Sequence, residues 1–419
     1  MKKIELLSPA GNLEKLKIAL SYGADAVYGG VSHFSLRLKS GKEFEEESFR
    51  EGIEYAHSLN KKVYVTINGF PFTSQLKLLR NHIAKMRDMN PDGIIVSTPG
   101  VIKLASEIAP NIPLHLSTQA NVLNYLDAEV FYDMGVKRII AAREMSLRDL
   151  EEIKKHIPEL ELEMFVHGAM CFAFSGRCLI TSFQTGRVAN RGSCANDCRF
   201  PYNVYVENPE TKALMRIEES EEGSYIFNAK DLNLSSYIKD IIECGVIDSV
   251  KIEGRTKSPY YAGVVTRAYR MAIDDVYNGK FDHKKYQAEL DTTKHRGFSD
   301  GYIFNRPHES NDTQNLETSI SDGTYDVLAL VDESGEYFMT KGKIDLTTVA
   351  EIVVPVGFEI NECENEIGRI YNQDNRFLIK FNKIVTQSEK ELLEVHSGNT
   401  NPIKLPIKLP SFTFLRSIV

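Results

Sequence analysis

Four of the six cysteines in this 419-residue chain lie close together, at Cys171, Cys178, Cys194 and Cys198. Thiolates are soft ligands, and four of them suit zinc or an iron–sulfur cluster. Structural zinc sites usually contain two C-x2–4-C pairs. Only the second pair has that spacing, because six residues separate Cys171 from Cys178. The irregular spacing favours a cluster, with zinc, a redox-active pair or four small buried residues as the alternatives.

Small and basic residues surround these cysteines. Nearby glycines would let the backbone wrap closely around an inorganic core, and the arginines that flank the cysteines could offset the negative charge of a cluster. The glycines are Gly168, Gly176 and Gly192, and the arginines are Arg177, Arg191 and Arg199.

One of the four cysteines could instead be a nucleophile. His167 precedes Cys171 by four residues, so a cysteine with a histidine base is conceivable. That pair would leave three neighbouring cysteines unexplained, and the chain contains no HExxH zinc motif. We expect the remaining Cys244 and Cys363 to pack in hydrophobic cores.

The composition is that of a globular protein, with 42% hydrophobic residues, 26% charged residues and a net charge of −8. The acidic balance argues against a general nucleic-acid coat, so any RNA contact needs a local basic patch. No apolar run reaches the roughly 18 residues that span a bilayer, and the N-terminal stretch does not resemble a signal peptide. We therefore expect a cytoplasmic protein, in which clustered cysteines more often bind metals than form disulfides.

Strand-like and helix-like segments alternate up to about residue 279. The predicted strands cover 3–11, 24–30, 61–69, 92–98, 112–119, 136–142, 160–168 and 247–255. The predicted helices cover 12–23, 43–60, 75–87, 101–109, 125–135, 147–157, 235–245 and 258–279. Eight such units close a parallel barrel, so we predict an α/β fold, a (β/α)8 TIM-like barrel, in preference to an open doubly wound sheet.

The alternation is interrupted after the seventh strand and changes character towards the C-terminus. Residues 168–227 form a cysteine-bearing insertion within a barrel domain of residues 1–304. A polar, turn-rich linker at 305–323 leads to residues 324–419, where apolar and polar residues alternate between turns. We predict a small all-β domain there, a β-barrel, with a sandwich as the alternative.

In barrels of this type the chemistry lies at the C-terminal ends of the strands, so residues there are the candidates. The predicted catalytic residues are Glu144, His167 and Glu253. The predicted substrate-binding residues are Asn68, Gln119, Asn121, Arg143, Arg191, Lys251 and Arg255. Lysine and arginine at the mouth suit a carboxylate or phosphate, although a salt-bridge network that holds loops would use the same residue types.

The segment around the first two cysteines carries the pattern ExFxxGAMCxxxxGRCxI, from Glu163 to Ile180. It resembles the signature of the collagenase-like peptidases, peptidase family U32. The stretches ELLSPAGNLEKLKIALSYGADAVYGG, NRGSCANDCR and KIEGR look like other blocks of that family, and the resemblance covers essentially the whole chain. One departure is Thr181, where the signature usually has serine.

The resemblance implies a function other than the proteolysis in the family name. Better-understood members of the family perform oxygen-independent hydroxylation, with prephenate as the oxygen source. They use an iron–sulfur cluster, most often 4Fe-4S, and its four cysteines match Cys171, Cys178, Cys194 and Cys198. The chain length is most like the branch that makes 5-hydroxyuridine at the tRNA wobble position. A collagenase-like protease and a zinc-stabilised RNA-binding protein without catalysis are the alternatives.

The resemblance also implies two partners, the anticodon region of tRNA and a small dicarboxylate, and no membrane. Prephenate would need cationic partners, for which Arg143, Lys251 and Arg255 are the candidates. A splayed anticodon base would stack on aromatic side chains. The aromatic candidates are Phe172, Phe174 and Tyr202, and the candidate basic patch is Arg177, Arg187, Arg191 and Arg199.

Overall fold

The structure is a computed structural model that describes residues 3–31, 34–35, 43–171, 173–187, 189–212, 214–217, 228–304, 313–315 and 321–418. Parallel strands form a closed ring: β1 (Glu5–Pro9), β2 (Ala26–Gly29), β3 (Lys62–Ile67), β4 (Gly93–Val96), β5 (Leu114–Leu116), β6 (Arg138–Ile140), β7 (Glu161–Ala169) and β11 (Ser249–Ile252). The ring closes because β11 pairs in parallel with both β1 and β7. The predicted barrel is confirmed, and an open doubly wound sheet is excluded.

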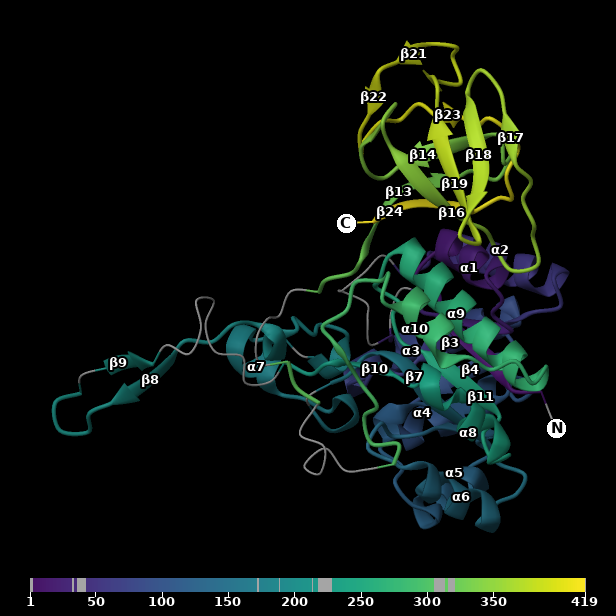
Figure 1. Cartoon of the computed structure of the whole chain (residues 1–419). Helices are drawn as coiled ribbons and strands as arrows, with labels where there is room; N and C mark the ends of the chain where they lie inside the picture. Colours follow the sequence, from purple (N-terminus) through teal and green to yellow (C-terminus); the bar gives the residue numbers. More distant parts are fainter. Residues whose placement is uncertain are drawn as a thin grey trace.

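Helices cover the outside of the barrel (Figure 1). They are α1 (Leu13–Ser21), α2 (Glu46–Ser58), α3 (Leu76–Met89), α4 (Pro99–Ile108), α5 (Tyr125–Asp133), α6 (Leu147–His156), α8 (Ile238–Glu243) and α9 (Pro259–Tyr277). Asn12, Ser146 and Ser258 cap α1, α6 and α9 by accepting a hydrogen bond from the N–H three residues on. The strands between the helices are buried on both faces, as parallel strands require.

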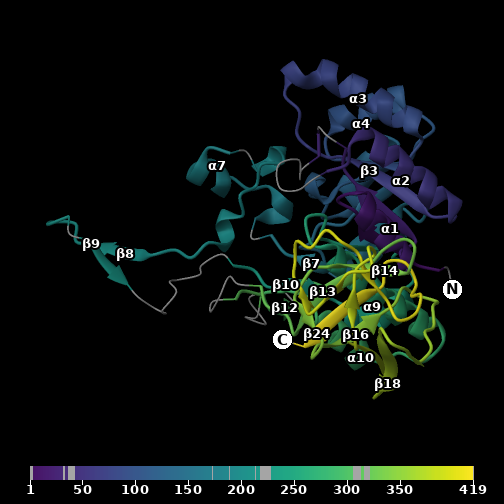
Figure 2. The same cartoon turned by 90° about the horizontal axis from the view of Figure 1, so that it is seen from above.

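The chain leaves the barrel after β7. The insertion contains α7 (Ile180–Thr185) and a hairpin of β8 (Val204–Glu207) and β9 (Leu214–Ile217) that projects away from the barrel (Figures 1 and 2). It returns through β10 (Asp231–Asn233), which pairs antiparallel with β7 and parallel with β12 (Phe298–Ser299). Sequence analysis did not predict β10, β12 or α10 (His283–Leu290), because the two strands are too short to show a period of two.

The C-terminal part is an antiparallel sheet in the order β17-β18-β19-β16-β24-β13-β14-β23. Its strands are β13 (Tyr325–Val331), β14 (Tyr337–Thr340), β16 (Val349–Val353), β17 (Cys363–Glu364), β18 (Gly368–Gln373), β19 (Arg376–Phe381), β23 (Ile403–Lys404) and β24 (Phe414–Ile418). Two short pairs accompany it, β15 (Ile344–Asp345) with β22 (Glu394–Val395) and β20 (Ile384–Val385) with β21 (Glu391–Leu392). The all-β prediction is confirmed. The domain boundaries stay predictions, because 305–312 and 316–320 of the linker lie outside the described residues.

The antiparallel sheet packs on the barrel (Figure 1). The ring of Phe414 on β24 lies 5.7 Å from the ring of Tyr22, which directly follows α1, and 5.3 Å from that of Tyr260 in α9, centre to centre. The Tyr22 hydroxyl donates to the carbonyl of Val353 at 2.8 Å. Among the described residues, no helix is both long enough and apolar enough to span a bilayer.

Candidate functional site

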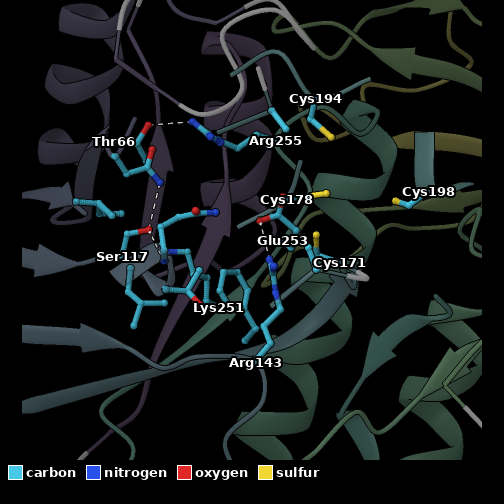
Figure 3. A pocket seen from close by; sticks show the side chains of 18 of the residues that line it. Thr66, Ser117, Arg143, Cys171, Cys178, Cys194, Cys198, Lys251, Glu253 and Arg255 are labelled. Atoms are coloured by element: carbon cyan, nitrogen blue, oxygen red, sulfur yellow. Dashed lines mark hydrogen bonds and ion pairs between the residues drawn. The ribbon is translucent and has the colours of Figure 1, made fainter. Parts of the chain in front are cut away.

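A cavity opens at the C-terminal ends of the barrel strands. All four clustered cysteines line it, and the barrel contributes polar and charged side chains to the same walls. The charged barrel residues are Arg143, Lys251, Glu253 and Arg255 (Figure 3). The insertion after β7 therefore brings the sulfurs and the mouth of the barrel to one cavity.

The four cysteines are partly exposed and form no disulfides. Burial raises the pKa of the Cys198 thiol to about 11; Arg199 opposes that rise, and the other three sulfurs add to it. Burial also raises the pKa of Cys178, whose sulfur accepts a hydrogen bond from the N–H of Ile180 at 3.4 Å. A bound cation would reverse these shifts, because metals bind the thiolate form.

The residues fit a metal centre by their chemistry and location. Four soft ligands line one cavity, with the cation of Arg199 beside them. Within the described residues, no three His, Cys, Asp or Glu side chains lie close enough together to hold one metal ion. A single ion such as zinc would therefore require the thiols to move closer together, whereas the four thiolates of a 4Fe-4S cluster bind different irons.

Lys251 and Glu163 form a buried ion pair beneath the cavity. The Lys251 Nζ lies 2.8 Å from Glu163 Oε1, and Arg138 Nη1 lies 3.1 Å from the other oxygen of Glu163. Arg138 also contacts Glu5 at 2.6 Å. Burial lowers the pKa of Lys251, and the charge of Glu163 opposes that shift. Lys251 thus lines the cavity, and the buried carboxylate of Glu163 compensates its charge.

Hydrogen bonds hold both the guanidinium and the backbone carbonyl of Arg255. Its Nη1 donates to Ser35 Oγ at 2.8 Å and to Thr66 Oγ1 at 2.9 Å (Figure 3 shows the contact with Thr66). Its carbonyl accepts a hydrogen bond from Lys15 Nζ at 3.2 Å. A Cβ at Gly11 would come within 2.3 Å of that carbonyl oxygen, so glycine is required there.

Arg143 is held more loosely than Arg255. Its Nη2 lies 3.7 Å from Glu253 Oε2 (Figure 3). Its guanidinium lies 4.4 Å from the centre of the Phe165 ring. The Tyr28 hydroxyl is 3.4 Å from the same oxygen of Glu253. A ligand's carboxylate could therefore compete for Arg143 at a small cost.

Carboxamides line another part of the cavity. Asn68 Nδ2 donates to Ser117 Oγ at 3.3 Å. Gln119 lies in the short helix η2 (Thr118–Ala120) that follows β5, and its carbonyl accepts a hydrogen bond from Arg177 Nε at 3.1 Å. Asn121 does not line the cavity; its Nδ2 donates to the carbonyl of Phe174 at 3.4 Å and ties the rim to the insertion.

Comparison with known proteins identifies the family. The model of peptidase family U32 matches residues 11–313, most of the chain. This chain belongs to peptidase family U32. It is 59% identical to tRNA hydroxylation protein P of Helicobacter pylori (strain ATCC 700392 / 26695) over 100% of both chains. It is 37% identical to the protein of the same name in Escherichia coli (strain K12), over 88% of this chain and 90% of that one. It is 32% identical to a Collagenase of Porphyromonas gingivalis (strain ATCC BAA-308 / W83), over 71% of this chain and 73% of that one.

The U32 signature residues lie on β7 and on the segment that follows it. Glu163 forms the buried ion pair, while Phe165, Cys171 and Cys178 line the cavity. Thr181, where the signature usually has serine, is 2% exposed and its Oγ1 accepts a hydrogen bond from the N–H of Ala195 at 3.4 Å. Threonine keeps the hydroxyl that this contact uses.

His167 does not line the cavity, contrary to what its position after β7 suggested. Its ring packs between Tyr269 and Phe298, each 5.5 Å away, and Nδ1 lies 3.4 Å from the Tyr269 hydroxyl. Burial lowers its pKa to about 3, so the ring is neutral at physiological pH. The register of β11 against β7 shifts between Lys251 and Ile252, beside His167, and interrupts the alternation that would have aimed it inwards.

Glu144 supports the insertion and does not line the cavity. Its carboxylate accepts hydrogen bonds from the backbone N–H of Ser175, at 2.6 Å, and from the hydroxyl of the same residue. Tyr202 likewise supports the insertion, since its hydroxyl donates to the carbonyl of Asp197 at 2.7 Å. The side chain of Arg191 and the whole of Phe172 lie outside the described part of the chain.

Sequence reasoning missed several residues that line the cavity, among them Thr66, Phe165 and Asp197. Period-two alternation could have found the first two, because Thr66 precedes Asn68 by two residues and Phe165 follows Glu163 by two. The signal for Asp197 was its place between two cysteines. Of the predicted catalytic residues, Glu253 is the one that lines the cavity.

Proposed function

We propose that this protein hydroxylates tRNA without molecular oxygen and forms 5-hydroxyuridine at the wobble position. One observation carries the proposal: the four cysteines line the same cavity as the cationic mouth of the barrel. A relative named tRNA hydroxylation protein P, 59% identical over the full length, supports it. Hydroxylating an unactivated pyrimidine carbon is chemistry that side chains alone do not perform and that cofactors supply.

A 4Fe-4S cluster would be held by Cys171, Cys178, Cys194 and Cys198. When bound, it would supply the electron-transfer chemistry that the reaction needs. The cation of Arg199 beside Cys198 would offset negative charge on the thiolates. Zinc on the same four thiols is the alternative.

Prephenate, the proposed oxygen source, would bind through its carboxylates at Arg143, Lys251 and Arg255. Arg143 would contribute most to new contacts, because its partner Glu253 is 3.7 Å away. Lys251 and Arg255 would supply N–H donors from positions fixed by the protein, because Glu163 and Glu43 hold them. Glu253, 14% exposed in its side chain, would hold or move a proton at Oε2.

The tRNA would contact the insertion, which exposes aromatic and basic side chains. Phe174, Phe183 and Phe200 are 50%, 85% and 49% exposed, and Arg177 and Arg187 are exposed near them in sequence. Single-stranded RNA binds such combinations by stacking and charge. A local patch of this kind reconciles RNA binding with a net charge of −8.

Anaerobic purification with iron and sulfide quantification tests the cofactor, and nucleoside mass spectrometry of tRNA from a deletion strain tests the reaction. We expect iron and sulfide in the protein, and loss of 5-hydroxyuridine that the wild-type gene restores. Replacing any of the four clustered cysteines with serine should abolish both the bound iron and sulfide and the restoration of 5-hydroxyuridine. Cys244→Ser and Cys363→Ser are the matched controls, because these cysteines pack against the hydrophobic cores. Zinc without iron, or unchanged 5-hydroxyuridine in the deletion strain, would contradict the proposal.

Proteolysis is the alternative that the collagenase relative favours. Two residues are candidate nucleophiles. One is Cys171, with His167 as its base, and the other is Ser299, which lies in the stretch GFSDG and so matches the GxSxG motif. His167 packs away from the cavity, and Ser299 ends β12 and is followed by a turn, unlike a strand–turn–helix nucleophile elbow. Peptide cleavage by cluster-free protein that is abolished by Ser299→Ala or Cys171→Ala would favour the protease.

A further inference from the structure

Two grooves adjoin the cavity at the mouth of the barrel. One lies between α3 and α4, which Figure 2 shows side by side. The other lies beside α6 and shares Cys171 with the cavity. An anticodon loop that places one base in the cavity has nucleotides on both sides of that base, so the RNA needs a further surface outside the cavity. The charges of the two grooves indicate which of them RNA can follow.

The groove between α3 and α4 begins where the cavity ends. Asn68, which lines the cavity, directly follows β3, and Phe70 lines the groove two residues further on. After β4, the Ser97 hydroxyl donates to the Asn68 carbonyl at 2.9 Å, and the next residue, Thr98, lines the groove. The guanidinium of Arg177 in the insertion lies 5.9 Å from the centre of the Phe70 ring. The groove therefore continues from the cavity and touches the insertion.

This groove, which we call the basic groove, combines apolar walls with two cations. Arg80 of α3 and Lys103 of α4 line it, and both side chains are exposed. Neither forms an ion pair with a residue that the structure describes. Of the described residues that line the groove, Glu107 alone is acidic. The apolar residues of its walls are Phe70, Pro71, Leu76, Leu79, Val101 and Leu104.

The groove beside α6, which we call the acidic groove, has the opposite charge balance. Its acidic lining residues are Glu144, Asp149 and Glu151, and its basic residue is Arg148. Like charges repel, so three carboxylates against one guanidinium disfavour a phosphate backbone there. Of the two surfaces that adjoin the cavity, the basic groove is therefore the one whose charge complements RNA.

We infer that the single-stranded RNA next to the target base leaves the cavity along the basic groove, with phosphates at Arg80 and Lys103 and a base stacked on Phe72. Phe72 is 57% exposed and follows Phe70 and Pro71 at the barrel end of the groove. Proteins that bind single strands combine a cationic groove for the backbone with aromatic rings for the bases. The inference rests on the proposed function and adds a path for the RNA outside the cavity.

Salt-dependent binding tests the two cations. An anticodon stem-loop is titrated with anaerobically prepared full-length protein, and fluorescence anisotropy is measured between about 50 and 200 mM salt. Each phosphate contact with a single strand contributes about 0.7 to the slope of log K against log salt concentration. Joint replacement by Arg80→Gln and Lys103→Gln should therefore flatten the slope by about 1.4 and weaken binding about tenfold or more at about 100 mM salt.

Arg148→Gln is the matched control, because Arg148 is exposed and lines the acidic groove. It should change neither the slope nor the affinity, and all variants should keep the wild-type Tm, since the replaced side chains are exposed. A double variant that binds as the wild type does overturns the inference and leaves the proposed hydroxylation standing; an acidic protein helix would then be the better occupant of the basic groove. A wild type that binds no stem-loop overturns both.

Photo-crosslinking locates the RNA directly. Phe72 adjoins the basic groove, and Phe304, which is 47% exposed, lines the acidic groove. Each is replaced in turn by p-benzoylphenylalanine, which keeps an aromatic ring at the position. We expect the variant at position 72 to crosslink to the anticodon loop with the higher yield. A higher yield from position 304 would place the strand in the acidic groove and overturn the inference.

Discussion

Glu163 compensates the positive charges inside the barrel. It is fully buried, and its two oxygens contact Lys251 at 2.8 Å and Arg138 at 3.1 Å. Removing one partner of a buried ion pair leaves the other charge uncompensated and costs about 3–5 kcal/mol. Glu163→Gln should lower the free energy of unfolding in urea by that amount. The control is Glu161→Gln: Glu161 contacts Arg138 at 2.7 Å but is 40% exposed, so its loss should cost less than about 1 kcal/mol. Equal losses would contradict this account.

Two buried groups should make the protein less stable in acid. Burial lowers the pKa of His167 from 6.5 to about 3, so below pH 6.5 the unfolded chain binds the proton first. Stability then falls by up to about 1.4 kcal/mol per pH unit. Burial raises the pKa of Glu5, but the positive charges of Arg138 and Lys62 together outweigh burial. The net effect lowers the pKa from 4.5 to about 2. Its contribution is complete above pH 4.5 and is lost as the pH falls towards 2.

These two windows can be separated with one variant. His167→Phe keeps a ring between Tyr269 and Phe298 but cannot bind a proton. Urea unfolding of the variant should show no loss of stability from this site between pH 6.5 and pH 4.5, while the loss below pH 4.5 remains. A variant whose stability falls as steeply as that of the wild type between those values would show that His167 is not the group responsible.

The loop between Cys171 and Cys178 is shaped by one carboxylate from another element. Ser175 has a φ of 39°, in the left-handed region that non-glycine residues seldom adopt, and Glu144 accepts hydrogen bonds from both its N–H and its hydroxyl. Hydrogen bonds to a charged group contribute about 1.5–3 kcal/mol each. Glu144→Ala should therefore speed amide exchange in this loop about tenfold or more, measured by mass spectrometry. The exposed Glu159 provides the control, Glu159→Ala; similar exchange in both variants would refute the role of Glu144.

The elements of the barrel could be predicted because their signals are local. Alternation in β3 and the 3.6-residue period in α6 need no knowledge of the rest of the chain, and strand ends then indicated Lys251 and Arg255 as cavity residues. The orientation of His167 could not be predicted, because it depends on a register shift between β7 and β11, which are distant in sequence. The role of Glu144 was hidden for the same reason, since its partner Ser175 lies 31 residues away.

Arg416 joins the antiparallel sheet to the barrel at the scale of the whole molecule. It lies on β24, is 3% exposed, and contacts Glu351 of β16 at 2.8 Å and Glu289 of α10 at 3.1 Å. Burial raises the pKa of Glu289, but the charges of Arg416 and Arg267 outweigh burial and lower it. Glu289 is therefore charged, and Arg416 joins it to Glu351 across the contact between the barrel and the sheet.

Arg416→Met should uncouple the unfolding of the two parts. The change leaves two acidic groups facing each other across the contact and should cost about 3–5 kcal/mol. In calorimetry we expect one cooperative transition for the wild type and two for the variant. Arg376→Met is the control, because Arg376 lies in the same sheet, is exposed and contacts only the Tyr325 hydroxyl among the polar groups described, at 2.8 Å. If Arg416→Met still unfolds in one transition at a lower temperature, the packing of Phe414 on Tyr22 and Tyr260 is sufficient to couple the sheet to the barrel, and the ion pairs add stability without adding cooperativity.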